Sequence, residues 1–243
     1  MMNCTEILMA KDKMEEECGV FGIYSKEINE VAQITYYGLY ALQHRGQESA
    51  GISVSNFGEI VTYKGMGLTA DVFTPETLNN LVGNAAIGHV RYSTTGASKL
   101  ENAQPLESRY KLGQIAVAHN GNLTNAKIIR ELLEDAGSTF NTSIDSEVII
   151  KMIARKANGN VEDAIRSTVG AIKGAYALVI LAGNKLVGVR DPYGIRPLCL
   201  GINENGDYIL ASESCAIDAV GGTLIRDVLP GEIVTITKDG IQS

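Results

Sequence analysis

The chain has 243 residues, of which 45% are hydrophobic and 20% are charged, and its formal net charge at pH 7 is −7. This balance excludes an intrinsically disordered chain, which would be poorer in apolar residues. The acidic charge and the lack of a Lys/Arg stripe argue against nucleic acid as a partner. The longest apolar run, 175–182, is too short to span a membrane, and no secretory signal opens the chain, so we expect a cytoplasmic protein.

Strand patterns dominate the first half of the chain. Residues 1–17 are polar, acidic and aperiodic, and we interpret them as a flexible leader. A helix is expected over 29–44 from the spacing of its apolar residues, and Thr74 before Pro75 predicts the N-cap of a short helix. Strands are expected over 20–24, 50–56, 59–64, 85–92 and 114–119.

Helix patterns cluster in the middle of the chain and strands return at its end. Three helices are expected, one from Thr124 to Gly137, one starting at 143–146 and one over 161–173. Strands are expected over 175–182, 186–190, 197–202, 207–211 and 231–237. This order is not a regular alternation of strand and helix, and it favours antiparallel sheets with helices packed outside them.

The four cysteines, Cys4, Cys18, Cys199 and Cys215, form no C-x-x-C pair, which argues against a zinc or redox site. We expect Cys199 and Cys215 to be core residues. Cys18 has two interpretations, of which the simpler is a small buried hydrophobe. The other is a nucleophile, because cleavage before Cys18 would expose a thiol and an α-amine, with a pKa of about 7.7–8, on one residue.

Several polar residues next to glycines also have two interpretations. Arg45 and Arg91 are either structural ion pairs or clamps for a carboxylate. His44, His89 and His119 are either buried, hydrogen-bonded histidines or candidates for the general base of a Cys/His hydrolase. No spacing in the sequence singles out one of the three.

Two further positions are ambiguous in the same way. Asn120-Gly121 fits a tight hairpin turn, or an oxyanion hole made by the Asn120 amide and the Gly121 N–H. Asp145 fits the N-terminus of a helix, or a carboxylate that holds a substrate ammonium.

The order of these residues is more specific than any one of them. From Cys18 to about Gly240, the chain resembles the glutaminase domain of class II (N-terminal nucleophile) glutamine amidotransferases. Three runs resemble the branch of this class that passes ammonia to phosphoribosyl pyrophosphate, the first step of purine synthesis: 42–51 (LQHRGQESAG), 88–94 (GHVRYST) and 190–198 (RDPYGIRPL).

The resemblance implies an α+β fold, the four-layer αββα sandwich of N-terminal-nucleophile hydrolases. It also implies that residues 1–17 are a propeptide and 18–243 the glutaminase domain. The reaction would be hydrolysis of L-glutamine to glutamate and ammonia through a thioester. The residue roles that it implies are Cys18 as nucleophile, Asn120 and Gly121 as oxyanion hole, Arg91 for the substrate α-carboxylate, Asp145 for the α-ammonium, Arg45 as a residue lining the site, Thr94 as a substrate-loop position and Tyr92 as a signal to the partner domain.

The resemblance also sets expectations for partners and cofactors. The related enzymes continue into a phosphoribosyltransferase domain that nothing in these 243 residues fits. We expect no metal site in this chain, whereas the full-length protein would use Mg²⁺ and a 4Fe–4S cluster and form a homo-oligomer. The alternatives are another class II amidotransferase, making glucosamine phosphate or glutamate, and an unprocessed, inactive glutamine-binding module.

Overall fold

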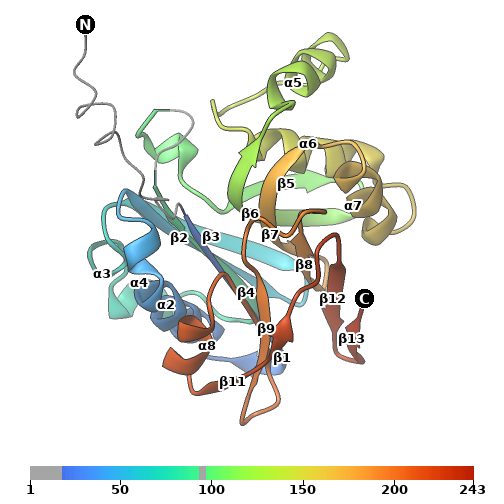
Figure 1. Ribbon diagram of the computed structural model, residues 1–243. Helices are drawn as coiled ribbons and strands as arrows, with labels where there is room; N and C mark the ends of the chain where they lie inside the picture. Colours follow the sequence, from blue (N-terminus) through green and yellow to red (C-terminus); the bar gives the residue numbers. More distant parts are fainter. Residues whose placement is uncertain (1–17, 93–96) are drawn as a thin grey trace, which may run out of the picture.

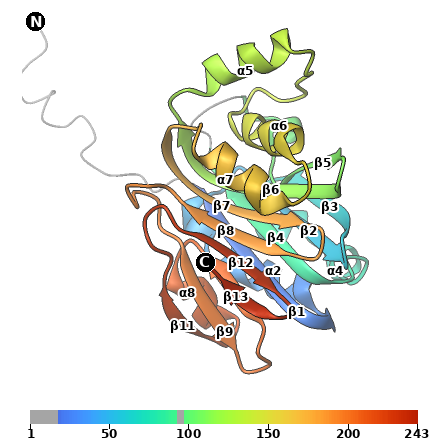
Figure 2. The ribbon, with the colours of Figure 1, turned by 90° about the vertical axis from the view of Figure 1, so that its right-hand side faces the viewer.

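The computed structural model describes residues 18–92 and 97–243, so the expected propeptide 1–17 and Thr94 lie outside the described residues. Two antiparallel β-sheets lie face to face at its centre (Figures 1 and 2). Within the described ranges, the first sheet has seven strands in the order β11 (Gly222–Asp227), β9 (Cys199–Asn203), β10 (Tyr208–Ala211), β1 (Gly19–Asn29), β4 (Gly83–Arg91), β2 (Ser49–Asn56) and β3 (Glu59–Met66). The second has six, in the order β13 (Gly240–Gln242), β12 (Ile233–Thr237), β8 (Leu186–Arg190), β7 (Gly174–Ala182), β6 (Gly113–Leu123) and β5 (Leu106–Tyr110).

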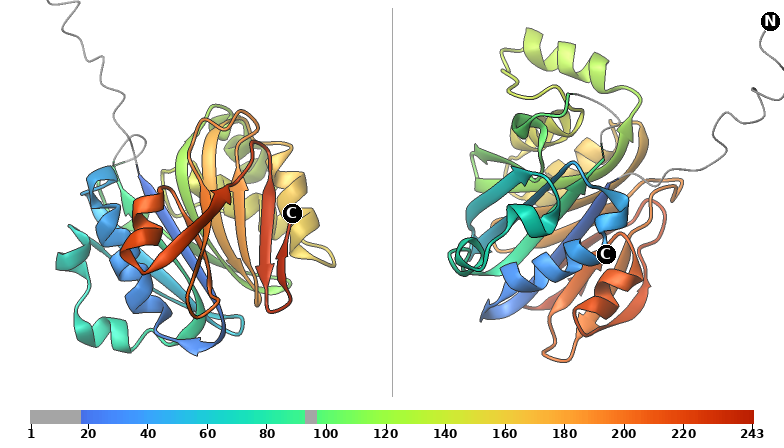
Figure 3. Two further views of the ribbon diagram at one scale, coloured as in Figure 1. Left: turned by 60° about the horizontal axis from the view of Figure 1, so that its bottom comes forward. Right: turned by 90° about the vertical axis from the view of Figure 1, so that its left-hand side faces the viewer.

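Helices cover the outer face of each sheet, as both views in Figure 3 show. The helices beside the first sheet are α2 (Val31–Ala41), α3 (Thr69–Val72), α4 (Pro75–Asn79) and α8 (Ser214–Ala219). The second sheet is covered by α6 (Ser146–Lys156) and α7 (Val161–Val169), and α5 (Ala126–Asp135) packs against α6 and projects beyond it (Figures 1 and 2). Two short 3₁₀ helices, η1 (Gln43–Arg45) and η2 (Leu100–Asn102), lie in connecting segments.

The alternation of side chains along the strands separates three apolar layers. In β1, Phe21 and Ile23 pack against the helices of the first sheet, whereas Val20 and Tyr24 face the second sheet. In β6, Ala116 and Ala118 face the first sheet, whereas Ile115 and Val117 face the helices of the second sheet. The layers therefore run helix, sheet, sheet, helix, which confirms the predicted α+β four-layer αββα sandwich.

Most of the predicted elements are present, with differences at their ends. The predicted cap of α4 is confirmed, because the Thr74 hydroxyl accepts the Thr77 N–H at 3.2 Å. The helix expected over 161–173 ends at Val169. The strands β5, β11 and β13 and the helices α3 and α8 were not predicted, because each is short and lacks a clear apolar period.

One of the two cysteines expected in the core is exposed. Cys199, in β9, is buried, and burial raises the pKa of its thiol to about 12. Cys215 is exposed, so the expectation was wrong for this residue. It lies in the first turn of α8, where Ala216 and Ile217 supply the buried face of the helix.

Candidate active site

The strands of the first sheet bring the predicted nucleophile beside a predicted substrate-binding arginine. Gly19 of β1 is opposite Val90 of β4 in the antiparallel register. Cys18 immediately precedes Gly19, and Arg91 immediately follows Val90. Cys18 and Arg91 therefore lie at the same end of the sheet.

The second sheet contributes β6 to the same end of the sandwich. His89 Nε2 of β4 lies 3.0 Å from His119 O of β6, a contact that joins the two sheets. Alternate residues of a strand share a face, so Asn120 faces the space between the sheets, as Ala118 does. His89 shares that face with Ile87. The site thus lies between the sheets, at the end where β1 begins and β4 ends.

Cys18 is held by its backbone. Its N–H donates to Arg45 O at 3.0 Å, and its carbonyl accepts the Arg45 Nε–H at 2.7 Å. The thiol Sγ lies 3.5 Å from Tyr92 O, and the residue is 8% exposed. The φ angle of Cys18 is +59°, which is strained for a residue with a Cβ. That torsion exists only while a residue precedes Cys18, so cleavage before Cys18 would remove the strain.

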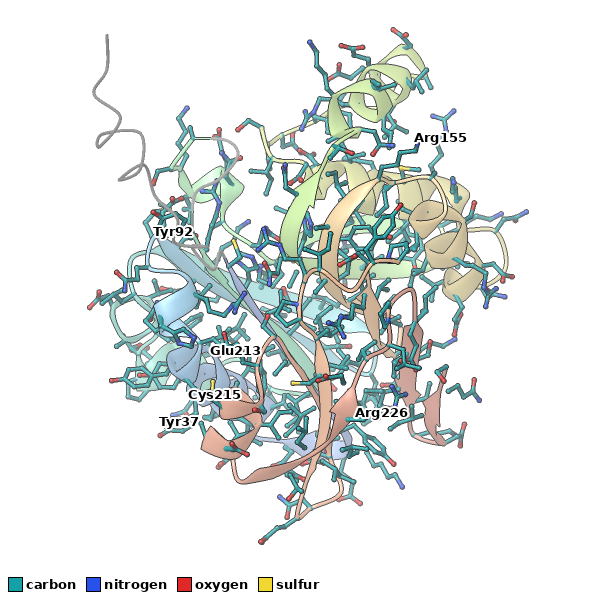
Figure 4. The ribbon with its side chains drawn as sticks, viewed as in Figure 1. Tyr37, Tyr92, Arg155, Glu213, Cys215 and Arg226 are labelled. Atoms are coloured by element: carbon teal, nitrogen blue, oxygen red, sulfur yellow. The ribbon has the colours of Figure 1, made fainter. Side chains whose placement is uncertain are left out.

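Arg45 is a buried cation next to the predicted nucleophile. Its side chain is 1% exposed, and its Nη1 pairs with the Glu213 carboxylate just before α8 (Glu213 is labelled in Figure 4). His44 Nε2 lies 3.2 Å from both oxygens of the same carboxylate. Arg45 therefore links the backbone of Cys18 to an anchoring anion, as a buried guanidinium requires.

Asn120 is fully buried, and its side chain has an unusual environment. Neither its Nδ2 nor its Oδ1 has a hydrogen-bond partner among the described residues. Leaving a buried amide unpaired costs about 1–3 kcal/mol, so such a group suggests a site for a ligand.

Gly121 has a backbone that only glycine fits. Its φ is +143°, and a Cβ at this position would lie 2.1 Å from Ala175 O. Residues two apart in a strand direct their N–H groups to the same side. The N–H groups of His119 and Leu123 bind side chains, Gln104 Oε1 and Asp145 Oδ2, at 2.8 Å each. The Gly121 N–H lies between the N–H groups of His119 and Leu123 along the strand and, like them, points away from β7. An N–H that is not part of the β6–β7 ladder can donate to a substrate oxygen.

Asp145 occupies the N-cap position of α6 and is 8% exposed. Its Oδ2 accepts the Leu123 N–H, and its Oδ1 lies 3.7 Å from His119 Nδ1. His119 Nδ1 also lies 3.0 Å from Ser146 Oγ. Burial lowers the pKa of His119, and the Asp145 charge opposes this effect. Asp145 is thus a carboxylate fixed at the end of β6 by its contacts with Leu123 and His119.

Arg91 forms an ion pair, which was the simpler interpretation of this residue. Its Nη1 pairs with the Glu48 carboxylate, and the side chain is 3% exposed. Its proposed contact with a substrate carboxylate stays a prediction. Tyr92 follows Arg91 and is 44% exposed, and Thr94 lies outside the described residues.

The three histidines occupy different environments. His44 lies in η1, with a side chain that is 53% exposed. His89 and His119 are buried in the interior of the sandwich. Burial lowers the pKa of His89 to about 3, so this imidazole is too weak a base to deprotonate a thiol near neutral pH.

Three residues that support the site were not given a role from the sequence. Glu48 pairs with Arg91, Glu213 pairs with Arg45, and the Gln104 side chain binds the backbone of His119. Glu48 lies in the run 42–51, where its charge next to Arg45 was the available signal. Glu213 is 168 residues from its partner, so only the fold reveals this pair.

A metal site is not evident in the part of the chain that the structure describes. No group of three or more His, Cys, Asp or Glu side chains there could hold a metal ion. Among the same residues, no helix is long and apolar enough to cross a membrane.

Comparisons with known proteins all find similarity to glutamine amidotransferases. A family model described as a glutamine amidotransferase domain matches residues 89–219, slightly more than half of the chain. Amidophosphoribosyltransferase 1, chloroplastic, of Arabidopsis thaliana is 48% identical over 233 residues, which are 96% of this chain and 41% of that protein. The amidophosphoribosyltransferase of Bacillus subtilis (strain 168) is 46% identical over 231 residues, 95% of this chain and 48% of that protein.

A solved structure is similar over the same extent. The structure of the allosteric regulatory enzyme of purine biosynthesis superimposes with a TM-score of 0.87 at 45% identity. The match covers 93% of this chain and 48% of that one. The chain therefore spans about half the length of the relatives that it matches.

Proposed function

Because the chain belongs to the glutamine amidotransferase domain family, we propose that it hydrolyses L-glutamine to L-glutamate and ammonia, with Cys18 as the nucleophile. One observation carries this proposal. The buried Asn120 amide, with no partner among the described residues, belongs to the residue before Gly121, at the end of the sandwich where Cys18 precedes β1. A thiol near two donors that can meet a developing oxyanion suits attack on an amide.

The first half of the reaction forms a thioester. Cys18 Sγ bonds to the side-chain carbonyl carbon of glutamine, and the C=O electron pair moves onto oxygen, where Asn120 Nδ2–H and the Gly121 N–H stabilise it. The α-amino group of Cys18 accepts the thiol proton and passes it to the leaving nitrogen. The C–N bond then breaks, and ammonia and a γ-glutamyl thioester result.

The second half restores the enzyme. Water adds to the thioester carbonyl, the C–S bond breaks, and glutamate leaves while sulfur regains its proton. Both halves use the α-amine as base, and its pKa of about 7.7–8 suits that task near neutral pH. The amine exists only after residues 1–17 are removed, so we propose that they are a propeptide and that 18–243 form the glutaminase domain.

The proposed substrate contacts place charges at the amino-acid end of glutamine. Arg91 binds the α-carboxylate and Asp145 accepts the α-ammonium, while Arg45 steadies the backbone of Cys18. Arg91 retains the Glu48 contact at one nitrogen, and a guanidinium offers further donors to a second carboxylate. Tyr92 and Thr94 adjoin Arg91 in sequence, which supports roles in the substrate loop and in contact with a partner domain.

For the longer protein, we propose that the ammonia converts phosphoribosyl pyrophosphate to phosphoribosylamine at the start of purine synthesis. The names of the relatives support this acceptor over glucosamine phosphate or glutamate. We assign the proposed phosphoribosyltransferase domain, Mg²⁺, the 4Fe–4S cluster and the homo-oligomer contacts to the half of the relatives that this chain does not match.

The experiment compares two proteins, one beginning at Cys18 and one in which residues 1–17 stay attached by a junction that cannot be cleaved. We expect only the first to release glutamate from glutamine. Cys18→Ala in the first protein should abolish release, whereas Cys215→Ala, which removes an exposed thiol, should not. Equal rates for the two proteins would contradict the α-amine mechanism and favour a side-chain base. Inactivity of both would support the glutamine-binding module.

A further inference from the structure

His89 is a fully buried polar residue to which the proposed reaction gives no role. It projects from β4 into the space between the sheets, and its Nε2 lies 3.0 Å from His119 O. A carbonyl oxygen only accepts, so Nε2 carries the proton and donates it across the sandwich.

The imidazole is neutral under ordinary conditions. Burial lowers its pKa to about 3, and the nearby His119, Arg91 and Lys64 also lower it, against the opposing effect of the hydrogen bond to His119. With the proton on Nε2, Nδ1 is left with a lone pair, and this atom has no partner among the described residues. His89 is thus a fixed hydrogen-bond donor.

A second buried side chain binds the same segment of β6. Gln104 Nε2 donates to His119 O at 3.3 Å, and Gln104 Oε1 accepts the His119 N–H at 2.8 Å. The carbonyl of His119 belongs to the peptide group that carries the N–H of Asn120. His89 and Gln104 therefore fix both peptide groups that flank His119.

The neighbouring strand leaves room for this arrangement. Gly51 of β2 is the cross-strand partner of His89. A Cβ at Gly51 would lie 2.1 Å from Gln104 O, so the backbone of Gln104 occupies the space that a side chain would take. The close approach of Gln104 to this part of the sheet thus depends on a glycine beside His89.

The position of the Asn120 amide depends on its backbone. The amide makes no hydrogen bond to the described residues, so protein contacts to its polar atoms do not orient it. Its location is set by packing and by the peptide group from which its side chain branches. A displacement of about 1 Å in a reacting group can lower a rate about 10²-fold.

We propose that His89 is a positioning residue, whose Nε2–H holds the His119–Asn120 peptide so that the Asn120 amide meets the oxyanion. This inference rests on the proposed hydrolysis of glutamine. It assigns His89 neither proton transfer nor substrate contact.

The kinetic test removes the donor and then replaces it. His89→Leu should lower kcat for glutamine hydrolysis about 10-fold or more and leave KM within about twofold. His89→Gln, which has an N–H donor, should recover part of the loss. The matched control is Asn84→Leu, a buried polar residue at the opposite end of β4, which should lower the melting temperature without changing kcat.

A double-mutant cycle separates positioning from a general structural effect. In an Asn120→Ala background, His89→Leu should reduce kcat by less than twofold, because the group that it positions is already gone. Independent, multiplicative losses, or an equal loss of kcat in Asn84→Leu, would overturn the proposal.

A spectroscopic measurement does not depend on turnover. Nitrogen-15 NMR of the imidazoles should show His89 neutral and protonated at Nε2 from pH 5 to pH 8, and His89→Leu should shift the side-chain amide resonances of Asn120 more than Asn84→Leu does. A proton on Nδ1, or titration near pH 6.5, would contradict the inference. If the wild-type protein releases no glutamate, the proposed function fails, and the NMR result still decides whether His89 positions Asn120.

Discussion

At the scale of single residues, buried polar groups without a hydrogen-bond partner inside the protein say most about where a ligand could bind. Asn120 is 0% exposed, and its amide is unpaired among the described residues, whereas most buried polar groups in proteins are satisfied. By contrast, Arg45 and Arg91 pair with Glu213 and Glu48. The paired groups have their partners inside the protein, and the unpaired amide is the one proposed to meet the substrate oxygen.

Asn120→Ala should lower kcat for glutamine hydrolysis about 10²–10³-fold with little change in KM. The side chain donates most strongly once negative charge has formed on the substrate oxygen, so its loss raises the barrier more than it weakens binding. Steady-state glutamate release measures both parameters. If Asn120 served only the local backbone, the variant would instead melt at a lower temperature and keep its turnover.

Arg91→Lys and Asp145→Asn should each raise KM for glutamine more than they change kcat. Both side chains are proposed to bind the amino-acid end of the substrate, far from the bond that breaks, so their interaction is similar in ground and transition states. Unchanged KM in both variants would show that these residues have a purely structural role, such as the Arg91–Glu48 pair.

The buried imidazole of His89 predicts a pH dependence of stability. Its pKa of about 3 in the folded state is below the unfolded value of about 6.5, so the unfolded chain binds more protons as the pH falls. The free energy of unfolding should therefore decrease by about 2 kcal/mol between pH 7 and pH 5 from this residue, and His119 adds a change of the same sign. Urea denaturation at several pH values measures the slope, which should be smaller in His89→Gln. An unchanged slope would contradict the assignment.

At the scale of elements, the end of β6 shows how one strand can present two different donors, the pair that we propose as the oxyanion hole. Side chains alternate, so Asn120 faces the first sheet and His119 faces α6, while odd-numbered N–H groups point away from β7. One strand thus directs an amide and a backbone N–H toward the same region.

Gly121→Ala should destabilise the fold and abolish glutamine hydrolysis. The new Cβ would clash with Ala175 O, and the alanine would have to adopt the strained positive φ of this position. The matched control is Gly113→Ala at the start of the same strand. Gly113 has a φ of +120°, but a Cβ there meets nothing within 4 Å. The control should lose about 1–3 kcal/mol of stability and keep its kcat. Equal effects of the two changes, by thermal melting and glutamate release, would contradict a special role for the position.

Elements defined by local patterns could be predicted, and those defined by distant partners could not. Thr74 and Thr77 form a capping box within one turn, which the sequence around Pro75 already indicates. The strand β11 forms because it pairs with β9, and its own residues do not alternate clearly between apolar and polar. Its sequence therefore gives no comparable signal.

At the scale of the whole molecule, the four layers bring together residues that are far apart in sequence. Cys18 immediately precedes β1 of the first sheet, Asn120 lies in β6 of the second, and the His89–His119 contact joins the two sheets. The order of motifs named residues that the fold places at one end of the sandwich, and their roles stay predictions. The supporting carboxylate of Glu213 and the amide of Gln104 could not be predicted, because their partners are 168 and 15 residues away and neither forms a local motif.

The proposed mechanism requires that Cys18 carries the glutamyl group between the two halves of the reaction. Its most direct test is mass spectrometry of the protein that begins at Cys18, acid-quenched while it turns over glutamine. We expect one glutamyl group on the peptide that starts with Cys18, which hydroxylamine removes and which is absent from Cys18→Ala. Continued release of glutamate with Cys18 unmodified, or a glutamyl group on another residue, would contradict it.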